Sequence, residues 1–241
     1  MPSFQTIITI IAVTLLLYVV YKYVTKDLSK LTNLTSAEIA TVVSLPTTAN
    51  TATTSNFAYS IWFYIDNWNY MNGLQKTVFQ RQATNTDSAS TYCPQVVLDA
   101  FLNNLIITLA TTPSSAATTS DSVTATIENI PIQTWVNVIV SVYTRTLDVY
   151  LNGKLVITKV MPGIATPYTN GSNTSVEVTP NGGFSGWTST FQYWPNAITP
   201  QQAFNVYSKG YGASRFANLF GTYDVKVTVT KDGAAETSMA F

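Results

Sequence analysis

The chain has 241 residues, of which only 10% are charged, with 12 Lys and Arg balanced by 12 Asp and Glu. This zero net charge lacks the basic field that nucleic-acid binding requires, so we set nucleic acid aside as a partner. The chain contains no histidine, which excludes imidazole zinc sites and Ser-His or Cys-His catalysis. Its single cysteine, Cys93, forms no internal disulfide, and we interpret it as a packed, inert thiol.

An apolar run opens the chain. No charged side chain precedes Lys22, and residues 7–21 (IITIIAVTLLLYVVY) are almost wholly apolar. With residues 2–6 the run reaches about 20 residues, enough to cross ~30 Å of hydrocarbon as a helix. It lacks the basic start and the small-residue cleavage site of a signal peptide, which favours a retained transmembrane anchor over residues 1–26. The expected anchor residues are Ile7, Ile11, Leu15, Leu16, Tyr18, Tyr21 and Lys22.

The lysines around the apolar run predict its orientation. Lys22, Lys26 and Lys30 all follow the run, and nothing basic precedes it except the amino terminus. By the positive-inside rule, a single-pass protein of this kind keeps its C-terminal domain on the cytoplasmic side. The lipid bilayer is therefore an expected partner, and the three Asn-x-Ser/Thr sequons further along would not be glycosylated.

Residues 27–55 are interpreted as a tether. Thr35 and Glu38 would cap a short helix, whereas Ile39, Val42 and Val43 would suit a strand, so the pattern leaves both conformations open. Residues 46–56 (PTTANTATTSN) are small and polar without an apolar period, which is typical of a linker or an ordered loop.

Period-two alternation dominates the middle of the chain. Residues 57–66 (FAYSIWFYID) carry apolar side chains on both faces, which indicates a central strand covered on each side. Residues 134–159 predict three consecutive antiparallel strands. A type I′ turn at Asn152-Gly153 is predicted to join the last two strands. Such a turn needs positive φ at both central residues, and Asn and Gly tolerate it. Two further strands, 104–109 and 123–130, flank a Thr/Ser-rich loop.

One short helix is predicted near residues 200–209. Thr199 is its N-cap, Pro200 occupies the first helical position, and Gln202 completes a capping box. Gly210 ends the helix. Its apolar stripe consists of Ala203, Phe204, Val206 and Tyr207. Beyond it, alternation on either side of Asp232-Gly233 predicts a β-hairpin tail over residues 220–241.

The Asn-Gly hairpin after a Trp-containing strand, the aromatic strand 57–66 and the segment 183–210 resemble the concanavalin A-like lectin/glucanase superfamily, particularly its laminin-G-like domains. The resemblance covers roughly residues 56–219 and implies an antiparallel β-sandwich, a concanavalin A-like jelly roll. The expected fold class is therefore mainly β, with one N-terminal transmembrane helix and one short helix. This sandwich hosts lectins, hydrolases and assembly modules alike, so the fold leaves function open.

The glucanase chemistry of this superfamily is not expected here. Retaining glucanases place two carboxylates about 5 Å apart, from an E-x-D-x-x-E pattern on one strand. None of the four glutamates is followed by a second acid at the spacing of this pattern; they are Glu38, Glu128, Glu177 and Glu236. No phosphate-binding or dinucleotide fingerprint occurs either. We therefore expect neither enzymatic activity nor a cofactor.

Lectins of this class pair loop oxygens with an aromatic platform, and one loop offers both. The candidate contacts to a glycan or a protein partner are Asp66, Asn67, Trp68, Asn69 and Tyr70. The alternative is that Asp66 and Asn67 begin a turn while Trp68 covers a sheet edge, and we favour it because one acid among amides makes a poor Ca²⁺ site. Trp135, Trp187 and Trp194 lie in strand-like runs and are interpreted as core or edge-packing residues.

The order of anchor, sandwich and hairpin tail resembles membrane-anchored minor structural proteins of large double-stranded DNA viruses of algae and protists. This resemblance implies a minor capsid protein that links the internal membrane of a virion to its shell, with capsid proteins as partners in a large assembly. The alternative is a membrane-displayed lectin that binds glycans.

Overall fold

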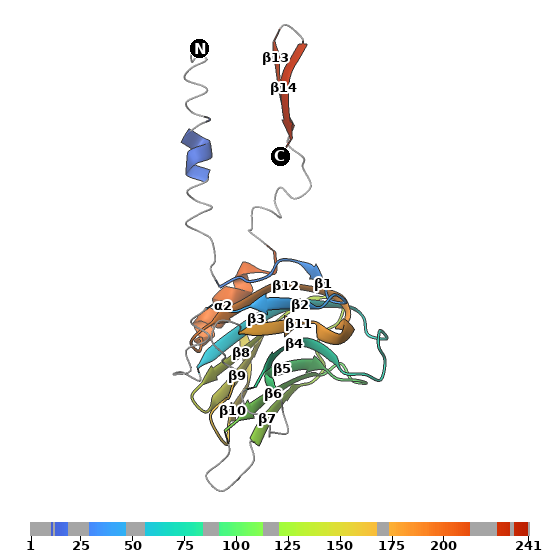
Figure 1. The fold of residues 1–241 in the computed structure, drawn as a ribbon, viewed down its shortest axis with the longest axis vertical. Helices are drawn as coiled ribbons and strands as arrows, with labels where there is room; N and C mark the ends of the chain where they lie inside the picture. The colour runs from blue at the N-terminus through green and yellow to red at the C-terminus, as the bar shows by residue number, and fades with distance from the viewer. Residues whose placement is uncertain are drawn as a thin grey trace.

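The computed structural model of the chain describes residues 11, 13–18, 29–46, 56–83, 92–112, 121–167, 174–212, 226–231 and 234–240. Its strands form two six-stranded antiparallel sheets and one two-stranded sheet. The six-stranded sheets face each other as a sandwich, and helix α2 (Pro200–Lys209) lies on the outer side of one of them (Figure 1). The predicted mainly-β sandwich is confirmed.

Sheet A is the sheet that α2 covers. Its strands are ordered β1-β12-β3-β8-β9-β10. Their bounds are β1 Thr35–Ser36, β12 Ser185–Trp194, β3 Phe57–Asn67, β8 Trp135–Tyr143, β9 Thr146–Leu151 and β10 Lys154–Val160.

Sheet B lies opposite and is ordered β2-β11-β4-β5-β6-β7. Its strands are β2 Thr41–Ser44, β11 Ser175–Val178, β4 Lys76–Gln82, β5 Tyr92–Leu98, β6 Leu105–Thr111 and β7 Asp121–Ile127. A short 3₁₀ turn, η2 (Pro180–Gly182), precedes β12.

The core forms between the inward faces of the two sheets. β3 contributes every second side chain to it, and Phe57, Tyr59, Ile61, Phe63 and Ile65 are all buried, as period-two alternation predicts. Arg81 of β4 is also buried in the core, where its Nη1 donates a hydrogen bond of 2.7 Å to the Tyr59 hydroxyl. Burial raises the pKa of Tyr59, which keeps its phenol neutral.

The outer face of β3 is also apolar, and α2 covers it. Ala58 of β3, Ile139 of β8 and Tyr150 of β9 form a second buried cluster with Ala203 and Val206 of α2. The helix has the predicted capping box: the Thr199 hydroxyl accepts from Gln202 N, and the Gln202 side chain accepts from Thr199 N. Phe204 differs from the prediction, because it is exposed instead of packing under the helix.

The β9-β10 turn fits against this helix. Asn152 and Gly153 both have positive φ, at 49° and 74°, as the Asn-Gly pair predicts. The turn is tied back to β8, since Asn137 N donates to Asn152 Oδ1 at 2.9 Å and Asn152 N donates to Asn137 O at 2.8 Å. A Cβ at Gly153 would lie 2.9 Å from Tyr207 Cβ and 3.2 Å from Phe204 Cα. Glycine is therefore needed here for close approach as well as for φ.

The structure corrects part of the predicted tether. The segment before β3 supplies β1 at the edge of sheet A and β2 at the edge of sheet B, so residues 35–36 and 41–44 belong to the sandwich. The sequence left both a short helix and a strand open for this segment, and the structure shows a strand. The strand is favoured because Val43 and Leu45 are buried in the common core, and this burial outweighs the local helix-capping signal.

The two ends of the chain are described only in part. Residues 11 and 13–18 are helical, whereas the rest of the predicted anchor, including Ile7, Tyr21 and Lys22, lies outside the described residues. Among the described helices, none has the length and hydropathy that a membrane span requires. In the tail, β13 (Lys226–Lys231) pairs antiparallel with β14 (Ala234–Ala240), and these two strands lie within the predicted hairpin. The Asp232-Gly233 turn itself lies outside the described residues.

Gly153→Ala tests whether the turn and α2 pack as tightly as described. Gly73→Ala is a matched control, because Gly73 also has positive φ, at 79°, but its Cβ would meet only Phe101 at an ordinary 3.8 Å. We expect Gly153→Ala to lower the free energy of unfolding by about 1–3 kcal/mol more than Gly73→Ala, which is the usual cost of overpacking. Urea unfolding of the full chain in detergent, followed by tryptophan fluorescence, measures this difference. Equal losses would contradict the packing.

Candidate functional site

The predicted contact loop, residues 66–70, adopts a turn at the end of β3. Asn69 N donates to Asn67 Oδ1 at 2.9 Å, which is an Asx turn, and the Tyr70 hydroxyl donates to Gly182 O at 3.1 Å. Asp66, Asn67 and Asn69 point to solvent, while Trp68 packs on the core. Among the described residues, no group of three His, Cys, Asp or Glu side chains comes together to hold a metal ion. A role for the loop in glycan or partner contact stays a prediction.

A buried lysine lies beneath this loop, and sequence reasoning missed it. Lys76, the first residue of β4, is only 2% exposed, and its Nζ has no hydrogen-bond partner among the described residues. Nζ lies 4.8 Å from the centre of the Trp68 ring, a cation-π distance. Burial lowers the pKa of Lys76, and attraction to the Asp99 carboxylate opposes this shift. The indole of Trp68 therefore serves to cover a charge at the base of the loop.

Three loops form one end of the sandwich, which we call the loop end: residues 68–75, 99–104 and 128–134. Gly73 N donates to Ala100 O at 3.3 Å, and Ile130 N donates to Asn103 O at 2.8 Å, so the loops lie side by side. Phe101 is 75% exposed at their tip. Leu74, Leu102 and Ile132 are also exposed. An apolar surface of this kind, on adjoining loops, is typical of a contact site.

The charged groups around the loop end are acidic. Asp66 and Glu128 are exposed and Asp99 is half-buried, whereas Lys76 is the only Lys or Arg within residues 66–76, 99–104 and 128–134 and is buried. Hydrogen bonds from the Phe101 and Leu102 amides lower the pKa of Asp99, so this carboxylate stays ionised at neutral pH. The loop end thus combines apolar tips with a negative rim.

A second surface is aromatic and lies on the outer face of sheet A. Tyr64 and Trp135 are neighbours across β3 and β8 with ring centres 5.7 Å apart, and Trp135 stacks on Tyr211 at 4.2 Å and 11°. Trp187 of β12 pairs with Tyr64 in the register and is 47% exposed. The Tyr211 carbonyl accepts from Ser189 Oγ and Thr190 Oγ1, at 2.7 and 2.9 Å, which fixes the chain after α2. We call Tyr64, Trp135, Trp187 and Tyr211 the aromatic face.

The aromatic face shows how two of the tryptophans lie. Trp187 is exposed and does not belong to the core, whereas Trp135 is half-buried and packs against Tyr64 and Tyr211, as a packing residue does. The alternation of residues 57–66 already places Tyr64 on the face opposite Phe57, Tyr59 and Phe63. No sequence signal would have placed Tyr211 over Trp135, because α2 brings them together. Trp194 remains a packing residue, against the cluster under α2.

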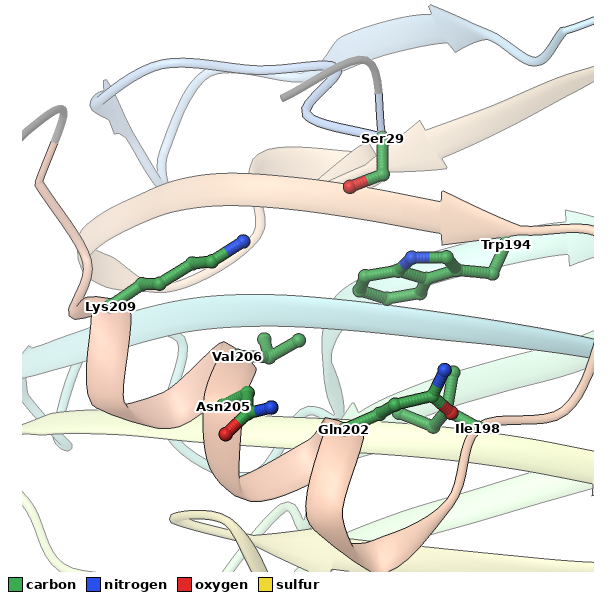
Figure 2. Close-up of a pocket in the computed structure, with 7 residues that line it drawn as sticks. All are labelled: Ser29, Trp194, Ile198, Gln202, Asn205, Val206 and Lys209. Atoms are coloured by element: carbon green, nitrogen blue, oxygen red, sulfur yellow. The ribbon is translucent and has the colours of Figure 1, made fainter. Parts of the chain in front are cut away.

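A small pocket lies between α2 and β12, with a volume of about 230 Å³. Figure 2 shows Trp194 and Lys209 reaching toward each other across it, with Gln202 and Asn205 along the helix and Ser29 on the opposite side. Ser29 lies there because the N-terminal segment is hydrogen-bonded to β12, with Tyr193 N donating to Ser29 O at 3.2 Å.

Cys93 is the inert thiol that the sequence predicts. It is fully buried in β5, and burial raises its pKa to about 12, so it is a thiol and not a thiolate at neutral pH.

The cost of burying Lys76 predicts a pH-dependent stability. Because its pKa is lower in the folded chain than in the unfolded one, Lys76→Met should raise the free energy of unfolding at pH 7, by about 1–2 kcal/mol. As pH rises toward 10.5, the folded protein loses the Lys76 proton before the unfolded chain does, so the stability of the wild type rises. The difference in the free energy of unfolding between Lys76→Met and the wild type should therefore become smaller. Urea unfolding of both proteins between pH 7 and 9.5 measures this difference. Exposed Lys154→Met is the control, and a destabilised or pH-independent Lys76→Met would contradict the account.

Comparison with solved structures finds botulinum neurotoxin binding domains. The serotype D ligand binding domain in complex with N-acetylneuraminic acid is 12% identical, with a TM-score of 0.55, over 74% of this chain and 42% of that chain. The binding domain of neurotoxin DC in complex with SialylT is 12% identical, with a TM-score of 0.51, over 70% of this chain and 39% of that one. This chain thus spans less than half the length of either structure, and at such identity the likeness shows the fold alone.

Comparison with curated proteins finds no match. A family model described as the concanavalin A-like lectin/glucanases superfamily, of the laminin G type, matches residues 37–204. The match begins in the turn between β1 and β2 and ends within α2, so it covers both sheets except the two-residue edge strand β1. The chain therefore belongs to the concanavalin A-like lectin/glucanase superfamily.

Proposed function

We propose that the protein is a non-enzymatic structural protein that links a membrane to a protein shell, as a minor capsid protein between the internal membrane and the shell of a virion. One observation carries this proposal. The N-terminal segment joins the sandwich near one end of the strands, and the exposed apolar loops lie at the other. Such an arrangement suits a bridge between two surfaces.

The membrane side of the bridge is the N-terminal segment. Leu31 N donates to Phe191 O at 2.7 Å, and the Lys30-Gln192 bridge continues this pairing along β12. At the other end of β12, Ser185 pairs with Asn67 beside the loop end. The apolar run ends at Tyr21, eight residues before Ser29, so an anchor there would hold this side of the sandwich close to a bilayer. In this proposal the sandwich lies on the cytoplasmic side.

The partner side of the bridge is the loop end. Its apolar tips, Phe101 and Leu102, are in the same loop as Asp99, and the adjoining chain segments carry Asp66 and Glu128. This combination suits a protein surface with an apolar patch and basic side chains around it. The β13-β14 hairpin offers a second contact. Among the described strands β13 and β14 pair only with each other, so each has an edge for strand addition.

The placement of the acids supports a role without catalysis. Glu38 lies between β1 and β2, Glu128 follows β7, and Glu177 belongs to β11. No two of them share a strand, as a glucanase pair would.

Incorporation into virus particles tests the bridge. We expect the double variant Phe101→Ser and Leu102→Ser to fold but to enter particles at least tenfold less, because exposed contact side chains carry much of an interface's free energy. Val160→Ser on β10 and Phe204→Ser on α2, which also remove exposed apolar side chains, should enter normally. Quantitative mass spectrometry of purified particles, and of their membrane fraction after the shell is disrupted, measures this. Normal incorporation of the double variant, or protein found only on infected-cell membranes, would refute the proposal.

A second candidate function is glycan binding by a membrane-displayed lectin, and the aromatic face favours it. Exposed Trp and Tyr rings with an apolar body and a polar edge suit the faces of sugar rings. The two neurotoxin binding domains described above are complexes with N-acetylneuraminic acid and SialylT, which supports a glycan as the type of ligand.

A glycan array probed with the full chain tests the second candidate. If the aromatic face binds sugars, defined glycans should bind at micromolar strength, and Trp187→Ala should weaken this binding at least tenfold, since a stacking contact is lost. Phe204→Ala, which removes an exposed aromatic ring from α2, is the control. An empty array, or binding that Trp187→Ala leaves unchanged, would count against this function for the aromatic face.

A further inference from the structure

The sandwich has two lateral sides, where its sheets end, and neither the loop end nor the aromatic face uses them. Sheet A ends in β1 and β10, and sheet B ends in β2 and β7. Figure 1 shows β1 and β2 at one margin of the sandwich and β10 and β7 at the opposite margin. We call β10 and β7 the β10 side. The β2 side consists of residues 29–45 and the adjoining strand β11.

The β10 side presents an open, apolar strand edge. None of the seven residues of β10 is buried, and among the described strands β10 pairs only with β9. Leu155, Val156 and Val160 are exposed on it. Lysine side chains commonly guard such edges, but Lys159 is turned toward β7, where its Nζ donates to Thr124 O at 2.6 Å. The edge therefore stays open to a partner.

The β2 side is apolar as well. Leu34, Ile39 and Val42 are exposed there, and among the described strands β2 pairs only with β11. Single exposed apolar side chains are normal on a protein surface. Three of them on each of two opposite sides indicate surfaces that are used for contact.

The charges of the two sides are complementary. β10 carries Lys154 and Lys159 and no acid, and β7 adds one acid. On the β2 side, Glu38 and Glu177 are exposed, and Lys30 is the one base. Each side thus has one charge in excess, which is positive on the β10 side and negative on the β2 side. Two like sides repel each other, whereas two opposite sides attract.

The complementary charges lie at the same height along the strands. One unbroken row of register partners crosses sheet B from edge to edge, through Val42, Glu177, Gln80, Gln95, Thr108 and Thr124. Lys159 reaches this row at Thr124, and Glu177 lies in it beside the other edge. A neighbouring copy at the same height above a membrane therefore brings its Glu177 close to Lys159.

The strand directions also favour contact between opposite sides. Each sheet has six strands that are antiparallel throughout, so its two edge strands run in opposite directions. Two copies that point the same end toward the membrane therefore bring opposite edges together antiparallel, which is the more stable arrangement. Two β10 strands would pair antiparallel only with the copies pointing in opposite directions, which anchors in one bilayer do not allow.

We infer that copies of this chain stand side by side, with the β10 side of one copy against the β2 side of the next. Such a contact is heterologous, so it repeats from copy to copy as a row or a closed ring. The inference rests on the proposed function in one respect, namely that the anchors of all copies lie in one bilayer. It goes beyond that function because the loop end and the shell take no part.

The size of the contact sets where the association occurs. Seven strand residues span roughly 24 Å, and the two sheets lie ~10 Å apart, so each side is small. Contacts of this size are weak between free molecules, whereas confinement to a bilayer raises the effective concentration of the copies. The association therefore belongs to membrane-bound copies.

Cysteine cross-linking of the full chain in bilayers tests the row. Cys93 is fully buried, so an introduced, exposed cysteine is the one that reacts. Val42→Cys marks the β2 side and Thr124→Cys marks the β10 side, and both positions are exposed. With a short thiol cross-linker, a chain that carries both cysteines should give a ladder of dimers, trimers and longer products. A mixture of the two single variants should give dimers only, and either single variant alone should stay monomeric.

A matched control measures chance collision in the same bilayers. Phe101→Cys combined with Thr124→Cys also places two exposed cysteines on one chain, but Phe101 lies at the loop end. At equal density in the bilayer, this control should give no ladder.

An exchange of charges tests which groups meet. Lys159→Glu alone, or Glu177→Lys alone, should lower the cross-linked fraction by about threefold, an effect of the size expected for an exposed ion pair. The chain that carries both changes should regain the ladder, because the attraction is restored with its sign reversed. Thermal melts report the stability of each variant, and losses of stability would add in the double variant instead of cancelling.

The outcomes separate the row from the bridge between membrane and shell. These bilayers contain no shell, so Phe101→Ser with Leu102→Ser should still form the ladder. A chain that does not insert counts against the proposed function, and the row is then read on vesicles that hold the chain through an added N-terminal His tag. The inference is overturned if the chain with both cysteines cross-links no more than the control, if a single variant cross-links to itself, or if the exchanged charges do not restore the ladder.

Discussion

A central strand that is apolar on both faces imposes the arrangement of this fold. β3 points Phe57, Tyr59 and Phe63 at sheet B, and it points Ala58 and Trp62 the other way. Each fully buried large apolar side chain contributes about 1.5–3 kcal/mol, so neither face can be left in water. Sheet B covers the first face. Helix α2 and the tyrosines that follow it cover the second.

That second cover explains several local features together. Tyr207 and Tyr211 both pack on Trp62, with ring centres 5.5 and 6.0 Å away, and Tyr211 is then held by Ser189 and Thr190. The β9-β10 turn must come close to the same helix, which leaves no room for a side chain at Gly153. The aromatic face and the pocket at Trp194 both result from this cover. The aromatic face lies beyond the end of α2, where Tyr211 stacks on Trp135, and the pocket lies along the side of α2 that faces β12.

The strands and the helix could be predicted from the sequence because their signals are local. Each of these signals acts within a few residues. They are the alternation in residues 57–66, the Asn152-Gly153 turn and the Thr199-Gln202 capping box. β1 and β2 could not be assigned, because two- and four-residue strands carry little alternation and their partners, β12 and β11, lie more than 100 residues away. The candidate surfaces depend on such distant contacts throughout. Lys76 meets Trp68 only once β4 pairs in its sheet, and Ser29 meets Trp194 only through β12.

The attachment of the N-terminal segment to β12 has a mechanical consequence. Residues 29–37 run along β12 and are held by bonds from Tyr193 to Ser29, from Leu31 to Phe191, from Phe191 to the Thr32 hydroxyl and from Ala37 to Gly186. A pull between Ser29 and the loop end acts along the strands, so it shears these bonds together and does not peel them one by one. Rupture would then require many bonds to break at once. The sandwich is thus built to carry tension along its strands.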